Sequence, residues 1–171
     1  PLIILEAIRE AEILVNVRQE RRKPILIDVE LICIDASKRS LDYLGRLLEE
    51  RGHGGALARG KVRLVKGEFA EHCGAAIQRC HDRSPRSGRA LFVLDQYGYS
   101  DVPMQCLHDI FAKLKYAEVI LTFYIDTLIN YLNENNLAAF EKATGISASV
   151  RASEIDEIKQ SPRWRVHLQS S

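Results

Sequence analysis

The sequence predicts an α/β protein built on a mainly parallel sheet with helices on both faces. Apolar runs of strand length alternate with longer segments of helical periodicity, and this order of strand then helix is typical of parallel sheets. The run over residues 90–94, between Arg89 and Asp95, is short, continuous and apolar, which indicates a strand buried on both faces. The chain has 171 residues, 46% of them hydrophobic, which is enough for a real core. We therefore expect one α/β domain over residues 1–171.

Each element follows from a local pattern. Apolar side chains at helical spacing predict helices over residues 1–23, 38–51, 70–81 and 102–115, and a further helix that begins at 126. Apolar runs predict strands over residues 29–35, 61–66, 89–95 and 118–124. Pro24 ends the first helix, and Ser37 is the expected N-cap of the second. Residues from about 134 to 171 predict a helical C-terminal extension.

The glycine-rich segment Gly52-His53-Gly54-Gly55 has the composition of a phosphate loop. It follows a predicted helix instead of a strand, and it lacks the third glycine of the dinucleotide fingerprint. We therefore interpret it as a flexible connection.

The composition says more about the cellular compartment of the protein than about its function. The net charge of +1 gives no strong field, so nothing in the overall balance demands nucleic acid. The four cysteines include no C-x-x-C pair, which argues against a zinc site or a disulfide framework and favours core thiols in a reducing compartment. No apolar stretch has the length of a membrane span, and no signal peptide heads the chain. We expect a cytoplasmic protein with no membrane association and no metal.

The single methionine of the sequence is Met104, so the sequence does not start at a start codon. We therefore expect it to be N-terminally incomplete.

Acidic residues stand at the ends of three predicted strands in succession: Asp35, Glu68 just past its strand, and Asp95. Ligands of open α/β sheets bind beyond the carboxyl ends of the strands, where a carboxylate can accept hydrogen bonds from ribose hydroxyls. Each acid alone could equally cap the following helix. The three together favour a nucleoside-binding cleft.

The segment Asp95-Gln96-Tyr97-Gly98 is more specific. A carboxylate, a backbone carbonyl and an aromatic ring in succession can accept both hydrogens of an exocyclic amine and stack on its base, as an amino methyltransferase requires. The simpler interpretation is a strand cap followed by a turn at Gly98, with the tyrosines packed on neighbouring helices.

Residues 91–100, with Val102-Pro103 after them, resemble the FFIDPFGYSxIP stretch of the three-Cys-motif partner proteins, a bacterial and phage family with a class I methyltransferase-like fold. Four other segments are similar to motifs of this family in the same order: residues 1–8 to SPLIALEAI, 32–35 to FIE, 65–69 to GDF, and 118–130 to EVLINF..YDAINRFL. The likeness covers most of residues 1 to about 135.

The resemblance implies a Rossmann-like class I methyltransferase fold that binds S-adenosylmethionine. Asp35 would bind the ribose hydroxyls, and Glu68 and Phe69 the adenine. The methyl-transfer pocket would be lined by Asp95, Gln96 and Tyr97.

The resemblance also implies an associated protein that bears a three-Cys motif, so the cysteines of this chain need not bind metal. In such folds the first strand and a glycine-rich loop would lie immediately before Pro1, and we expect both to be missing from the sequence. Gln96 stands where the family motif has proline, which removes the rigid turn that proline enforces.

The sequence supports two hypotheses about function. The first is an S-adenosylmethionine-dependent methyltransferase-like protein that acts on a nucleic-acid base or other amine. The alternative is a non-catalytic module of the same fold, which binds a partner protein or nucleic acid near Tyr97, Tyr99 and Trp164. A nuclease or nucleotide hydrolase is the weakest candidate, because no paired-carboxylate metal motif has convincing spacing.

Overall fold

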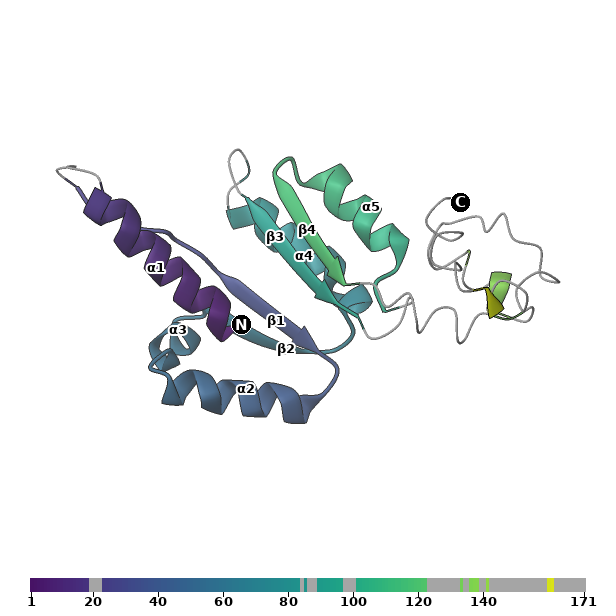
Figure 1. Ribbon diagram of the computed structural model, residues 1–171, viewed down its shortest axis with the longest axis horizontal. Helices are drawn as coiled ribbons and strands as arrows, with labels where there is room; N and C mark the ends of the chain where they lie inside the picture. Colours follow the sequence, from purple (N-terminus) through teal and green to yellow (C-terminus); the bar gives the residue numbers. More distant parts are fainter. Residues whose placement is uncertain are drawn as a thin grey trace. The chain divides into compact units, whose positions relative to one another are not determined.

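The chain divides into two compact units, Pro1–Glu68 and Phe69–Ser171 (Figure 1). The computed structural model describes residues 1–18, 23–83, 85, 89–96, 101–122, 133, 136–138, 141, 160 and 161. The single domain expected over residues 1–171 stays a prediction. The helix expected from residue 126 lies outside the described residues, and so does most of the C-terminal extension expected from about 134.

The first unit contains two parallel strands joined through helices (Figure 1). Its elements in order are α1 (Leu2–Arg18), β1 (Leu31–Asp35), α2 (Lys38–Glu50), α3 (Gly54–Ala58) and β2 (Val62–Lys66). Leu31 pairs with Val62 at one end of the two strands and Asp35 with Lys66 at the other. Both strands therefore run toward the edge that carries Asp35.

Helix α2 forms as the sequence predicts. The Ser37 side chain accepts a hydrogen bond from the Ser40 N–H at 3.2 Å, which confirms Ser37 as the N-cap. Leu41 and Leu48 are buried at the expected helical spacing. A Cβ at Gly45 would lie 3.3 Å from Leu64 Cδ1, so the glycine permits close packing of α2 on β2.

The connection after α2 differs from the prediction. Gly52, at φ 81°, ends α2, and the chain then forms the short helix α3 instead of a flexible segment. The His53 carbonyl accepts hydrogen bonds from the N–H groups of Ala56 at 2.8 Å and Leu57 at 3.3 Å, which close the first turn of α3. Gly52 thus ends α2, and Gly54 and Gly55 begin α3.

Helix α1 is fixed to the chain that follows it. The Asn16 side chain donates a hydrogen bond to the Ile25 carbonyl at 2.8 Å and accepts one from the Ile25 N–H at 2.6 Å. Residues 24–30 form no helix, in agreement with the expected stop at Pro24. The expected last residues of this helix include 19–22, which lie outside the described residues.

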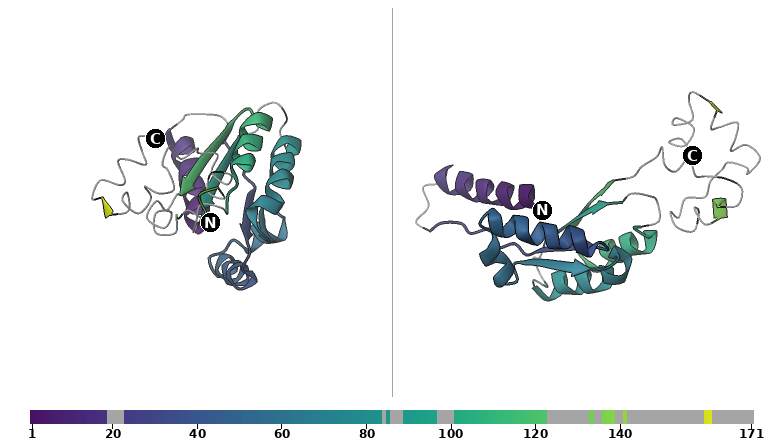
Figure 2. Two further views of the ribbon diagram at one scale, coloured as in Figure 1. Left: turned by 90° about the vertical axis from the view of Figure 1, so that its right-hand side faces the viewer. Right: turned by 90° about the horizontal axis from the view of Figure 1, so that it is seen from below.

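The second unit contains a second parallel pair of strands, covered on one side by two helices (Figure 2). Its elements are α4 (Phe69–Arg83), β3 (Ala90–Asp95), α5 (Met104–Lys113) and β4 (Ala117–Thr122). The register runs from Ala90 opposite Ala117 to Asp95 opposite Thr122. Its buried core consists of residues from α4, from β3, and from α5 with the segment before it: Cys73, Ala76, Ile77, Phe92, Leu94, Val102 and Ile110.

The prediction that β3 is buried on both faces is wrong for this structure. Phe92 and Leu94 are buried, whereas Leu91 and Val93 are 57% and 51% exposed. Successive side chains of a strand point to opposite faces, and α4 and α5 pack on the face of Phe92 and Leu94. Ile120 of β4 is also exposed, at 56%. The continuous apolar run therefore forms a strand, β3, of which α4 and α5 cover one face.

The α/β class and the parallel strand pairing are confirmed. Within the described ranges, no helix combines the length and the apolar character that crossing a membrane requires.

Candidate functional site

The carboxyl end of the β1–β2 pair brings two of the predicted residues close together. Asp35, the last residue of β1, is exposed, and its Oδ1 accepts a hydrogen bond from the Ser37 N–H at 2.7 Å. The Asp35 carbonyl accepts a second bond from the Gly67 N–H at 3.1 Å. Glu68 follows Gly67 directly, so Asp35 and Glu68 lie at the same edge of this strand pair.

Local chemistry explains this turn. Gly67 has φ 149°, a positive value that favours glycine and lets the chain bend beside Asp35. The segment that leads into α2 adds the Ser37 N–H, whose hydrogen bond to Oδ1 orients the Asp35 side chain. Lys38 forms an ion pair with Asp42 at 2.7 Å, one turn further along the helix. Its ammonium group is therefore directed along α2.

Phe69 belongs to the second unit, where it begins α4. It is half-buried, and its ring contacts the ring of Phe92 edge-on, with the centroids 6.5 Å apart. The structure therefore gives Phe69 a packing contact with the core. Its adenine-binding role stays a prediction.

The end of β3 carries the predicted methyl-transfer residues. Asp95 is exposed, while Gln96 is only 3% exposed and its Oε1 accepts a hydrogen bond from the Val102 N–H at 3.2 Å. The Gln96 side chain thus fixes the end of β3 to the segment that leads into α5. Sequence reasoning considered the Gln96 carbonyl and missed this side-chain role, because a single polar residue after a strand has no periodic signal. Tyr97 lies outside the described residues.

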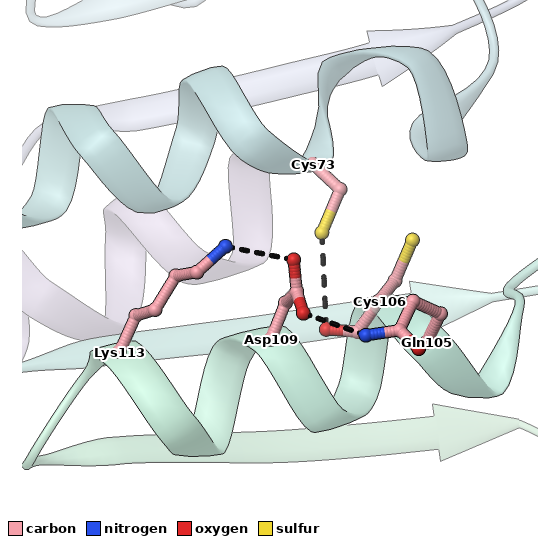
Figure 3. Close-up of polar contacts among 5 residues, drawn as sticks. All are labelled: Cys73, Gln105, Cys106, Asp109 and Lys113. Atoms are coloured by element: carbon pink, nitrogen blue, oxygen red, sulfur yellow. Dashed lines mark hydrogen bonds and ion pairs between the residues drawn. The ribbon is translucent and has the colours of Figure 1, made fainter.

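A group of polar side chains lies between α4 and α5, and sequence reasoning did not identify it (Figure 3). The Cys73 thiol on α4 donates a hydrogen bond to the Cys106 carbonyl on α5 at 3.9 Å. Burial, followed by the interaction with the neighbouring Cys106 thiol, raises the pKa of Cys73 to about 12. The prediction of core thiols is confirmed for Cys73, which is 3% exposed.

Asp109, on α5, binds two neighbouring side chains in the same region between α4 and α5, called the α4–α5 seam below (Figure 3). Its carboxylate accepts hydrogen bonds from Lys113 Nζ and from Gln105 Nε2, each at 2.8 Å. The bond from Lys113, followed by the bond from Gln105, holds the pKa of Asp109 below its usual range. Asp109 therefore stays ionised beside the two thiols.

The structure thus places Asp35 and Glu68 together in the first unit, and Phe69, Asp95 and Gln96 in the second. Among the residues that the structure describes, no group of three or more His, Cys, Asp or Glu side chains could hold a metal ion. Comparisons with protein-family models, with curated proteins and with solved structures found no match.

Proposed function

We propose that the protein binds S-adenosylmethionine and is methyltransferase-like, with a nucleic-acid base or other amine as the methyl acceptor. The observation that carries the proposal is Asp35: an exposed carboxylate at the end of a parallel strand, oriented by the first turn of a helix. Acids in this position accept hydrogen bonds from the ribose hydroxyls of nucleoside cofactors.

The hydrogen bonding of Asp35 suits this role. An ionised carboxylate offers about four acceptor positions, and the Ser37 N–H occupies one of them. The remaining positions on this exposed side chain can accept two ribose hydroxyls. The bond between Gly67 and the Asp35 carbonyl sets Glu68 at the same edge, which supports the adenine contact that the resemblance implies for Glu68.

Methyl transfer would require little covalent chemistry from the protein. Asp95, exposed at the end of β3, would accept a hydrogen bond from the acceptor amine and orient the nitrogen lone pair. The resemblance assigns Gln96 and Tyr97 to the same pocket. It also suggests an associated protein with a three-Cys motif and a nucleic-acid substrate as partners.

Calorimetric titration of the full-length protein with S-adenosylmethionine tests the proposal. Asp35→Ala should weaken binding by about 10- to 100-fold, because hydrogen bonds to a charged group contribute about 1.5–3 kcal/mol. Asp42→Ala is the matched control, since Asp42 is also exposed but pairs with Lys38 on α2. No binding heat with the wild type, or equal losses in the two variants, would contradict the proposal.

A second candidate is a non-catalytic module of the same fold that binds a partner protein or nucleic acid. Tyr97, Tyr99 and Trp164, near which the sequence predicts this binding, lie outside the described residues. The exposed apolar side chains of Leu91, Val93 and Ile120 on one face of β3–β4 favour it, because apolar surface of this kind suits a protein contact. Methyl transfer by the Asp95→Ala variant distinguishes the two candidates. Loss of a measurable methyl transfer in this variant, with S-adenosylmethionine binding retained, would exclude the non-catalytic module.

A further inference from the structure

The seam between α4 and α5 holds two thiols that face each other. Cys73 points from α4 toward α5, and Cys106 points from α5 toward α4 (Figure 3). We propose that Cys73 and Cys106 form a redox-active pair that closes to a disulfide bond between the two helices. This proposal is independent of the proposed cofactor and methyl acceptor.

The geometry favours this pair over Cys73–Cys80, the pair within α4. Cys73 Sγ lies 3.9 Å from the backbone oxygen of Cys106, so the sulfur already reaches the backbone of its partner residue. Cys80 is on α4 itself, two helical turns beyond Cys73, a separation of about 10 Å along the helix axis at about 1.5 Å per residue. Disulfide bonds require Cα atoms within about 7 Å, so α4 must unfold before Cys73 can bond to Cys80.

The two thiols differ in accessibility, which sets the order of the exchange. Cys106 is half-buried and Cys73 is buried, with its pKa raised by that burial. With a low-molecular-weight disulfide such as oxidised glutathione as the oxidant, the Cys106 thiolate attacks one glutathione sulfur. The glutathione S–S bond breaks, one glutathione leaves as a thiolate, and a mixed disulfide forms on Cys106.

The second step closes the bridge. Cys73 gives its proton to solvent and attacks the Cys106 sulfur, and the second glutathione leaves as a thiolate that takes up a proton. In total, two protein thiols are oxidised and one glutathione disulfide is reduced to two thiols. The bridge would tie α4 to the first turn of α5, just after Val102, which Gln96 holds.

Peptide mapping of the oxidised wild-type protein tests the proposal. The folded protein is incubated with oxidised glutathione, the remaining thiols are alkylated, and trypsin is added without reductant. The four cysteines then fall in four separate peptides: residues 23–38, 67–79, 80–83 and 90–113. We expect one cross-linked product that joins peptide 67–79 to peptide 90–113, and a protein mass lower by two hydrogens.

Matched variants and an unfolded control make the result specific. Cys106→Ser should abolish the cross-link, whereas Cys80→Ser should retain it. In denaturant the preference should shift toward Cys73–Cys80, because a shorter loop closes at lower entropic cost. A native product that joins 67–79 to 80–83, glutathione adducts alone, or an unchanged thiol content would overturn the proposal.

Discussion

The hydrogen bond between the Gln96 side chain and the Val102 N–H provides the sharpest test of how the end of β3 is held. Gln96→Met removes the acceptor but keeps an unbranched side chain of similar size. Gln96 and Val102 are both buried, so the Val102 N–H would lose its partner in a site with little access to water.

The magnitude follows from two opposing effects. A buried donor without an acceptor costs about 1–3 kcal/mol, and burial of an apolar thioether in place of an amide offsets part of this cost. We expect a net loss of about 1–2 kcal/mol in the free energy of opening this segment, which corresponds to a factor of about 5–30 in the opening equilibrium.

Amide hydrogen exchange at Val102 measures the opening equilibrium directly, and urea unfolding gives the stability of the whole unit. Gln105→Met on the exposed side of α5 is the control and should change stability by less than about 0.5 kcal/mol. If Val102 exchanges equally fast in the wild type and in Gln96→Met, the reasoning that assigns this bond a structural role is refuted.

Two further predictions concern the core of the second unit. Ile110→Ala should lower the unfolding free energy by about 2–5 kcal/mol in urea titrations, because Ile110 is fully buried. Phe111→Ala, next to it but 59% exposed, should cost far less, and equal losses would contradict the assigned core. Because burial raises the pKa of Cys73 from about 9 to about 12, its neutral thiol stabilises the fold fully below pH 9, and this contribution declines as the pH rises toward 12. The stability difference between the wild type and Cys73→Ala should therefore shrink by about 1.4 kcal/mol between about pH 8 and about pH 10, and a constant difference would refute the assignment.

Local patterns predicted most of the elements well. The N-cap at Ser37 and the helix that follows it were predictable, because a capping bond joins residues three apart and apolar spacing marks the buried face. The strand ends at Asp35 and Asp95 were also predictable, since each apolar run stops at an acid. The short helix α3 was missed, because glycines within 52–55 suggest flexibility unless neighbouring carbonyls receive hydrogen bonds.

The candidate site was predictable only in part. An acid after a strand is visible in the sequence, so Asp35 was identified. Its proximity to Glu68 depends on the pairing of β1 with β2 and on the bond from Gly67, which join residues far apart in the chain. The structural role of Gln96 depends in the same way on where Val102 lies.

The sequence by itself determined the α/β class, the parallel order of strands and helices, and the acids at the strand ends. These features follow from periodicity and from residues close together along the chain. The tertiary structure alone decided which face of β3 is covered and that Cys73 meets Cys106. Both depend on how α4 and α5 pack, because a continuous apolar run does not specify on which side a helix will lie and no local pattern relates two cysteines on different helices.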